Sequence, residues 1–275
     1  LVGTKWPGQI LTRGASRAPP HGPRNAITTG ARGELCSRFR ALTEGRHRPR
    51  GAAHFRGVRR CTERGEARQP RGQGAEVRTV PLADDFGLDT GGIMAAVDGN
   101  TKMVFVCSPN NPTANLMDRD AVAGLCTALS GRALVVVDET YIDYADADSM
   151  AAELERFENL VVLRTLSKSH AAAGLRCGVT VARADVTELL QKVLAPYPVP
   201  QPVVQAALAI LTPANQARLA ARREEIIARR DAFAKQALAT GPVKKILPTD
   251  ANYLLMFVDD ADALCARAAD QGCIL

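Results

Sequence analysis

Short apolar segments alternate with amphipathic ones from residue 76 onward, and this alternation limits the possible folds more than any other feature. The apolar segments have the length and β-branched content of buried strands, and the segments between them have helical periodicity. The expected strands are residues 76–80, 102–107, 133–137, 161–163 and 177–182, and the expected helices are 89–97, 118–130 and 149–157. Apolar strands separated by helices are typical of a parallel, helix-covered sheet. The sequence therefore predicts an α/β fold with a mostly parallel sheet.

The remainder of the chain is expected to form a smaller, second unit. Helices are predicted over residues 185–194, 203–211, 215–240 and 260–271, and a strand over 252–258. The long helix 215–240 is charged and amphipathic, which suits a connection between two domains. We therefore expect a large domain over residues 73–212, and a linking helix with a partial α+β domain over 213–275. A further strand is expected to begin at residues 272–275, so this domain is predicted to be truncated.

Residues 1–72 differ from the rest in composition. Residues 1–75 carry 16 of the 35 Lys and Arg residues but only 4 of the 29 Asp and Glu residues, and they are rich in Ala, Gly and Pro. No helical or strand period is sustained there. We expect a disordered basic segment, or GC-rich DNA translated out of frame, rather than a packed domain. A basic arm that binds RNA is a minor alternative, and nucleic acid is otherwise not an expected partner.

Composition also bears on location, membranes and metals. No apolar run approaches the roughly 20 residues of a membrane span, and the first residues lack the apolar core of a secretory signal. The seven cysteines show neither zinc-site spacing nor a regular disulfide framework. We therefore expect reduced thiols, no bound metal, no membrane partner and a cytoplasmic location.

Polar side chains follow three of the expected strands, at the point where each strand ends. In parallel sheets the carboxyl ends of the strands meet at one edge, where ligands bind. The three pairs of polar residues are Asn110 and Asn111, Asp138 and Tyr141, and Ser167 and Lys168. We expect all of them to converge on one crevice.

The residues around Lys168 indicate the kind of ligand. A lone lysine at the end of an apolar strand is poorly solvated, which favours the neutral amine that forms Schiff bases. The hydroxyls of Thr165 and Ser167 lie beside it, and Arg176 follows eight residues later. Hydroxyls and an arginine suit a phosphate dianion, because arginine gives paired charge-assisted hydrogen bonds. An imine-forming lysine with a phosphate site predicts pyridoxal phosphate.

Four motifs, taken in order, resemble the fold-type-I pyridoxal-phosphate-dependent aminotransferases of class II. They are SPNNPT at 108–113, VVVDETY at 135–141, RTLSK at 164–168 and GLRCG at 174–178. Within that family the sequence is most similar to the histidinol-phosphate aminotransferases, to which KVLAPYPVPQPV at 192–203 and DQGCIL at 270–275 are also similar. The resemblance covers residues 74–275. It implies a homodimer that transfers an amino group between glutamate and imidazole-acetol phosphate in histidine biosynthesis.

The catalytic roles of that family carry over to the matching positions. The resemblance implies that Lys168 forms the Schiff base and moves the proton during catalysis. Asp138 would pair with the pyridine nitrogen and keep it protonated. Asn111 and Tyr141 would hydrogen-bond the ring 3′-oxygen. Lys168, Asp138 and Tyr141 are therefore the expected catalytic residues.

Phosphate and substrate contacts are implied in the same way. Thr165, Ser167 and Arg176 would bind the 5′-phosphate of the cofactor. Asn252 and Tyr253 are the candidates for contact with the amino-acid and keto-phosphate substrates.

The chain departs from the family pattern at several positions. Ala114 stands where the family has glycine, and Ser169 and His170 replace a small residue and an aromatic one. The family's glycine-rich phosphate turn and its substrate-carboxylate arginine are not readable in this sequence. Three alternatives therefore remain: an aromatic aminotransferase, a threonine-phosphate decarboxylase, or a non-catalytic fragment.

Overall fold

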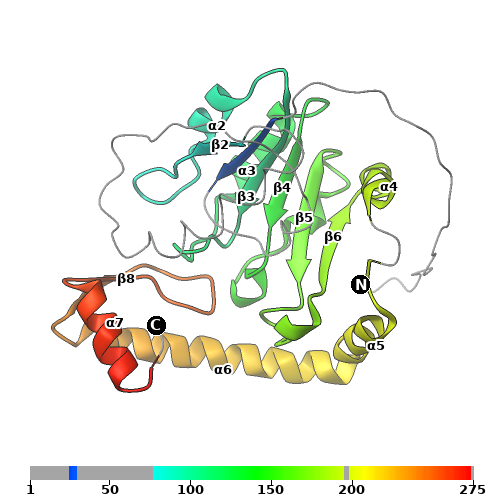
Figure 1. The fold of residues 1–275 in the computed structure, drawn as a ribbon. Helices are drawn as coiled ribbons and strands as arrows, with labels where there is room; N and C mark the ends of the chain where they lie inside the picture. The colour runs from blue at the N-terminus through cyan, green and yellow to red at the C-terminus, as the bar shows by residue number, and fades with distance from the viewer. Residues whose placement is uncertain (1–24, 30–76, 195–197, 274–275) are drawn as a thin grey trace.

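A six-stranded sheet dominates the computed structural model, which describes residues 25–29, 77–194 and 198–273 (Figure 1). Its strand order is β2-β1-β3-β4-β5-β6, and β7 and β8 form a separate two-stranded sheet. The strands are β1 (Asn25–Thr29), β2 (Val77–Val80), β3 (Thr101–Cys107), β4 (Leu134–Asp138), β5 (Leu160–Thr165), β6 (Gly178–Ala182), β7 (Val243–Ile246) and β8 (Met256–Val258). The neighbours from β2 to β5 are parallel, and β6 is antiparallel to β5. The predicted mostly parallel α/β fold is confirmed.

Helices connect the strands and extend beyond the sheet. They are α2 (Thr90–Ala96), α3 (Arg119–Ala128), α4 (Ala184–Val193), α5 (Gln201–Ile210), α6 (Pro213–Leu238) and α7 (Ala261–Asp270), with 3₁₀ turns η3 (Ile142–Tyr144), η4 (Met150–Glu153) and η5 (Ala173–Leu175). The side chains of Asp89, Asp118 and Asp260 cap α2, α3 and α7 by accepting a backbone N–H. Figure 1 shows α6 running below the carboxyl ends of β4 and β5. Among the described residues, no helix has the length and apolar character needed to cross a membrane.

The structure differs from the sequence-based expectations at three places. The helix expected at 149–157 is only the short turn η4, because the Glu139 carboxylate binds the Met150 amide and holds the segment from outside. The strand expected at 252–258 is shortened to β8, which pairs with the unexpected β7. Strand β1 was also not expected, because its pairing with both β2 and β3 is long-range and leaves no local pattern. The strand expected to begin at 272–275 lies partly outside the described residues.

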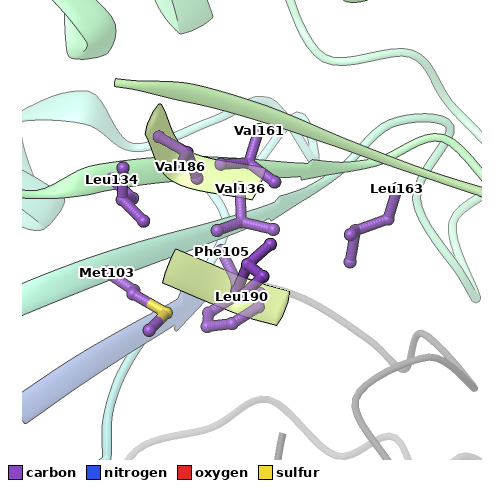
Figure 2. A pocket seen from close by; sticks show the side chains of 8 residues that line it. All are labelled: Met103, Phe105, Leu134, Val136, Val161, Leu163, Val186 and Leu190. Carbon is purple, nitrogen blue, oxygen red and sulfur yellow. The ribbon is translucent and has the colours of Figure 1, made fainter. Parts of the chain in front are cut away.

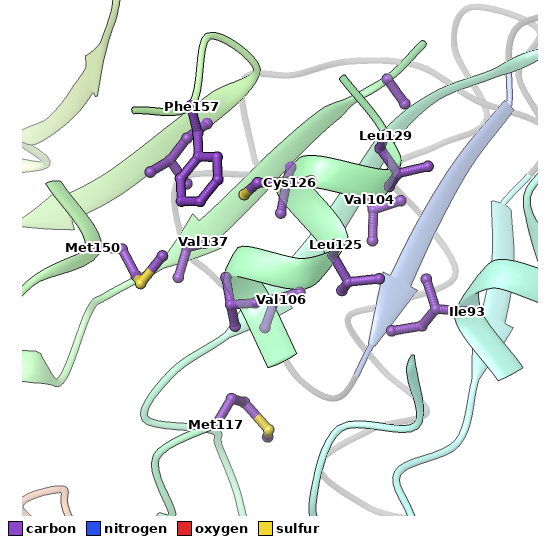
Figure 3. Close-up of a cluster of buried hydrophobic side chains, with 14 of the residues drawn as sticks. Ile93, Val104, Val106, Met117, Leu125, Cys126, Leu129, Val137, Met150 and Phe157 are labelled. Carbon is purple, nitrogen blue, oxygen red and sulfur yellow. The ribbon is translucent and has the colours of Figure 1, made fainter. Parts of the chain in front are cut away.

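One face of the sheet carries the larger hydrophobic core. Side chains alternate between the faces along each strand, so Val104 and Val106 of β3 point to the same side. Figure 3 shows Leu125 of α3 and Leu129, which directly follows this helix, lying against this face. Ile93 of α2 closes the same cluster, in which all of these side chains are buried. This packing fixes β3, β4 and β5 side by side and so fixes the edge where they end.

The opposite face is apolar as well but is covered mainly by α4. Val136 of β4 and Val161 and Leu163 of β5 pack there against Val186 of α4. A small hollow remains between the helix and the sheet, as Figure 2 shows. It is lined by Met103, Phe105, Leu134, Val136, Val161, Leu163, Val186 and Leu190. Since every lining side chain is apolar, this hollow is a packing feature and not the polar crevice expected at the strand ends.

Candidate active site

The turn that follows β3 presents Asn111 to the crevice. The buried Asn110 holds the turn, because its Nδ2 donates to Thr113 Oγ1 at 2.7 Å and its carbonyl accepts from the Ala114 amide at 2.7 Å. Ala114 is fully buried with φ of 65°, a left-handed conformation that favours glycine, in agreement with its replacing the family glycine. Asn111 Nδ2 donates to the hydroxyl of Tyr141 at 3.2 Å. Asn111 and Tyr141, which were expected to bind the same oxygen of the ligand, are thus brought together.

Asp138 ends β4 as a buried carboxylate with one oxygen engaged. Only 5% of the residue is exposed, and its Oδ1 accepts the backbone N–H and the hydroxyl of Thr140 at 3.0 and 2.6 Å. Among the described residues, none donates to Oδ2. Burial raises the pKa of Asp138, although the bonds from Thr140 and the charge of Lys168 act against that shift. The carboxylate is therefore suited to accept a proton or hydrogen bond from a ligand.

Lys168 follows β5 and reaches toward the same turn. Its side-chain nitrogen lies 5.5 Å from the centroid of the Tyr141 ring. The turn that carries it is closed by two backbone bonds, from Ala171 N to Lys168 O and from Ala172 N to Leu166 O, both 2.9 Å. The lysine is half-buried. Its amine is therefore placed beside Tyr141 and near Asp138.

Thr165, Ser167 and Arg176 lie together where β5 meets β6. Thr165 Oγ1 donates to Ser167 Oγ at 2.9 Å and accepts the Ser167 amide at 3.0 Å. Arg176 joins them because the antiparallel register pairs Thr165 with Gly178. Its guanidinium donates to the carbonyl of Ala173 at 3.0 Å. The register therefore brings the segment of Arg176 beside the two hydroxyls at the end of β5.

The two expected substrate residues behave differently. Tyr253 donates its hydroxyl to the carbonyl of Asn110 at 2.8 Å, and its ring meets Tyr141 edge-on with centroids 5.2 Å apart. Burial raises the pKa of Tyr253, so the phenol stays protonated. Asn252 is exposed. The structure places Tyr253 against Asn110 and Tyr141 and leaves Asn252 exposed at the surface.

Hydrogen bonds join the loop at 249–253, which carries Tyr253, to the turn after β3. The sequence motifs gave no sign of these bonds. The Asp250 amide donates to Ala114 O at 2.7 Å, and the Asp250 carboxylate accepts from Leu116 N at 2.9 Å. Arg230 of α6 donates to Ala251 O at 2.6 Å and fixes the loop from the other side. No short motif could have revealed these bonds, because their partners lie far apart in the sequence.

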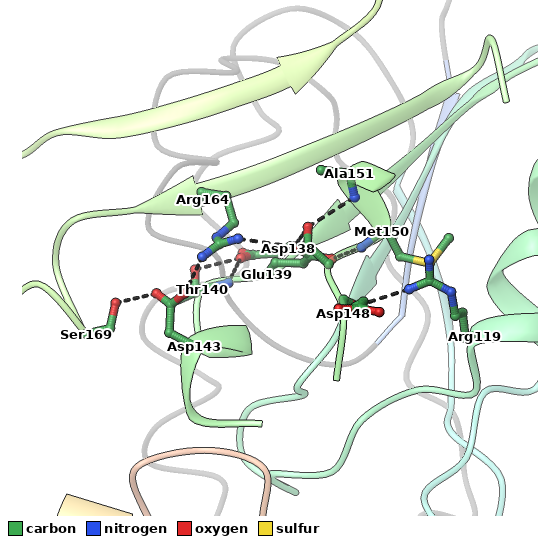
Figure 4. A network of polar contacts seen from close by, with 11 residues as sticks. Arg119, Asp138, Glu139, Thr140, Asp143, Asp148, Met150, Ala151, Arg164 and Ser169 are labelled. Atoms are coloured by element: carbon green, nitrogen blue, oxygen red, sulfur yellow. Dashed lines mark hydrogen bonds and ion pairs between the residues drawn. The ribbon is translucent and has the colours of Figure 1, made fainter. Parts of the chain in front are cut away.

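A second network of polar side chains lies behind Asp138, and the sequence motifs did not predict it. Figure 4 shows Glu139 at its centre. This residue is 1% exposed, and its carboxylate accepts the Ser149 hydroxyl at 2.5 Å and the Met150 amide at 2.6 Å. Arg164 of β5 lies 3.7 Å from the same carboxylate and also pairs with Asp143. Burial raises the pKa of Glu139, while the hydrogen bonds and Arg164 oppose that shift. The network ties β4, β5 and η3 together behind the crevice.

Comparison with known proteins identifies the class of protein to which this fold and this crevice correspond. The family model described as aminotransferase class I and II matches residues 67–275. The chain belongs to this family. The match begins a few residues before the start of the resemblance seen in the motifs, and the predicted family membership is confirmed.

The names of individual similar proteins are more specific than the name of the family. A histidinol-phosphate aminotransferase of Vibrio parahaemolyticus is 45% identical over 202 residues, which is 74% of this chain and 58% of that protein. The chain therefore spans little more than half the length of this relative. A solved histidinol-phosphate aminotransferase from Sinorhizobium meliloti, in complex with pyridoxal-5′-phosphate, has a TM-score of 0.69 at 23% identity and covers 93% of this chain and 63% of that one.

The fold alone does not separate reactions within this group. The solved L-threonine-O-3-phosphate decarboxylase of Porphyromonas gingivalis has a TM-score of 0.62 at 19% identity, and covers 92% of this chain and 66% of that one. These likenesses confirm the expected fold of the pyridoxal-phosphate aminotransferases for the large domain. The choice between reactions rests on the sequence relatives.

Proposed function

We propose that this chain binds pyridoxal 5′-phosphate in the crevice at the ends of β3, β4 and β5. The residues present fit that group, because one amine, one buried carboxylate and one amide–phenol pair converge there. Lys168 would attach to the cofactor aldehyde, Asp138 would face the protonated ring nitrogen, and Asn111 with Tyr141 would hold the ring 3′-oxygen. Thr165, Ser167 and Arg176 would bind the phosphate.

The protein residues then have distinct tasks. When bound, the cofactor supplies an electron-withdrawing ring that stabilises negative charge at the substrate carbon. Lys168 would act first as general base and then as general acid, taking up the proton released at the substrate carbon and donating it again. Asp138 would pair with the protonated ring nitrogen, since a buried carboxylate strongly favours a positive partner. Tyr253, whose ring meets Tyr141 edge-on, would limit the access of water on that side of the site.

The reaction we propose is amino transfer between glutamate and imidazole-acetol phosphate, as in a histidinol-phosphate aminotransferase. The observation that carries this choice is the 45% identity to a protein of that name, which extends over all the site motifs. The decarboxylase shares only the fold at 19% identity, so its reaction is less well supported. No observation favours an aromatic aminotransferase over these two.

A reductive trapping experiment tests the proposal. The purified chain is mixed with pyridoxal phosphate, its visible absorbance is recorded, and borohydride is added before the peptides are mapped by mass spectrometry. We expect a visible band that borohydride removes while the cofactor stays covalently bound at Lys168, followed by glutamate-dependent amino transfer. A folded chain that traps no cofactor would support the fragment alternative. Trapping without transfer to imidazole-acetol phosphate would refute the proposed substrate.

We further propose that the protein acts as a homodimer. Helix α5 has no buried residue, and Leu208 on it is 65% exposed; Leu189 on α4 is 61% exposed. Exposed apolar helices of this kind indicate a partner surface. A second copy is the best candidate, because α5 contacts η5, which immediately precedes Arg176. The same surface would then shield the phosphate end of the crevice.

Sedimentation velocity tests the dimer. The chain is expected to sediment as a dimer, and Leu208→Glu is expected to shift it toward the monomer, because a charge would have to be buried in the interface. Leu238→Glu is the matched control, since Leu238 is an exposed leucine on α6. A monomeric wild-type chain, or equal effects of the two variants, would refute the proposed interface.

A cytoplasmic location completes the proposal. Four described cysteines, Cys126, Cys177, Cys265 and Cys273, are free thiols. Free thiols are typical of a reducing compartment.

A further inference from the structure

One buried hydrogen bond links the two loops that carry Lys168 and Tyr141. Ser169 follows Lys168 directly, is 5% exposed, and donates its hydroxyl to the carboxylate of Asp143. Asp143 lies in η3, two residues after Tyr141. The bond therefore joins positions one and two residues away from the amine and the phenol of the proposed site. It fixes how closely the two loops approach each other.

The carboxylate that accepts this bond is held in its charged form. Arg164 pairs with Asp143 and also lies 3.7 Å from the buried Glu139 carboxylate, so it is anchored on the strand β5 itself (Figure 4). Burial acts to raise the pKa of Asp143, but the bond from Ser169 and the charges of Arg164 and His170 outweigh it and leave that pKa below its usual value. A hydrogen bond to a charged acceptor is stronger than one between neutral groups.

His170 extends the connection to the long helix. Its Nδ1 lies 2.9 Å from Ser169 Oγ, and its ring lies beside Gln216 on α6. Because the Ser169 hydroxyl hydrogen points to Asp143, Ser169 Oγ is left to accept, and the Nδ1 hydrogen of His170 can donate to it. The turn after Lys168 is therefore held from η3 on one side and from α6 on the other.

We propose that Ser169 is a positioning residue, which, through Asp143 and Arg164, holds the Lys168 turn at the separation from Tyr141 that cofactor attachment requires. This inference rests on the proposed function for its role, but the contact itself exists without any ligand. Neither Ser169 nor Asp143 touches the proposed cofactor or substrate. Their effect passes through the backbone of the two loops.

Ser169→Ala tests the proposal, and Ser149→Ala is its matched control. Both serines donate to a carboxylate of the same network, but Ser149 bonds Glu139 on the side away from the Lys168 turn. Freeing the turn lowers the fraction of chains that are ready to attach the cofactor, which raises the apparent dissociation constant in proportion. We expect pyridoxal phosphate to bind about 10-fold to 100-fold more weakly to Ser169→Ala, as the loss of one bond to a buried charge would predict.

Ser149→Ala is expected to bind the cofactor within about twofold of the wild type, because Ser149 bonds Glu139 and makes no bond to Asp143 or to the Lys168 turn. Asp143→Asn and Ser169→Ala should be non-additive, so that the double variant binds no more weakly than the weaker single variant. Ser169→Thr, which keeps the hydroxyl, should restore binding. Equal losses in Ser169→Ala and Ser149→Ala, or additive losses in the double variant, would overturn the proposal.

A ligand-free measurement separates this proposal from the proposed function. Amide hydrogen exchange across residues 166–172 should become at least about tenfold faster in Ser169→Ala and stay unchanged in Ser149→Ala. If wild-type chain binds no pyridoxal phosphate but shows this exchange difference, the proposed function fails and the positioning contact stands. If the exchange rates of the two variants are equal, the positioning role is refuted whether or not the cofactor binds.

Discussion

Lys168→Ala is expected to abolish covalent attachment of pyridoxal phosphate and to reduce amino transfer by more than about 10⁴-fold. The amine lies 5.5 Å from the Tyr141 ring centroid and is the attachment point in the proposed site. No other described lysine contacts Tyr141. Removing it takes away both the covalent link and the group that moves the proton. The measurement is the visible spectrum before and after borohydride, followed by mass spectrometry of the intact chain.

Lys102→Ala provides the control for this result. Lys102 is an exposed lysine on β3, the strand that leads into the site. It should leave both the trapped mass and the transfer rate unchanged. A Lys168→Ala chain that still gains the mass of the cofactor after borohydride would show that attachment occurs elsewhere, and the proposed site would be wrong.

Asp138→Asn is expected to lower amino transfer by about 10²-fold to 10³-fold while making the ligand-free chain more stable at neutral pH. Burial raises the pKa of Asp138 above its unfolded value, so the folded chain holds this proton more tightly. Stability from such a group is fully present below the unfolded pKa and is lost as pH rises through the folded pKa. Asparagine removes that loss, because it carries no charge at neutral pH.

The stability part of this prediction is measured by thermal unfolding over a range of pH. The gain in melting temperature should be largest at neutral pH and should disappear in acid, where the wild-type carboxyl is protonated. Asp98→Asn should behave in the opposite way. Although desolvation acts against them, hydrogen bonds from Arg78, Thr101 and Asn100 lower the pKa of Asp98 to about 2, so that its charge stabilises the fold above that pH. A loss of stability in Asp138→Asn at neutral pH would contradict the argument.

The strands that form the crevice could be predicted because each is a continuous buried run. Val135, Val137 and Leu163 carry that pattern in the sequence, and the polar residues after them mark where the strands end. Family resemblance then assigned roles to those residues. Most of the predicted site residues lie near one edge of the sheet in the structure. Tyr253 reaches that edge from a separate loop, and Asn252 is exposed.

What the sequence could not provide depends on contacts between distant segments. The bond from Leu116 to Asp250 joins residues 134 positions apart, and no local periodicity encodes it. The helix expected at 149–157 is only a short 3₁₀ turn in the structure. The Met150 amide at its start donates to the carboxylate of Glu139, a residue that lies outside this segment. The Ser169 and His170 pair could be noticed as a departure from the family, but only the structure revealed Asp143 as its partner.

The bonds between the loop at 249–253 and the turn after β3 also have a mechanical consequence. Asp250 binds that turn at Ala114 and Leu116, and Tyr253 binds it at Asn110. The turn and the loop are thus joined as one stiff wall, with Arg230 bracing it from α6. Any opening of the crevice that leaves these bonds intact must pivot outside the wall.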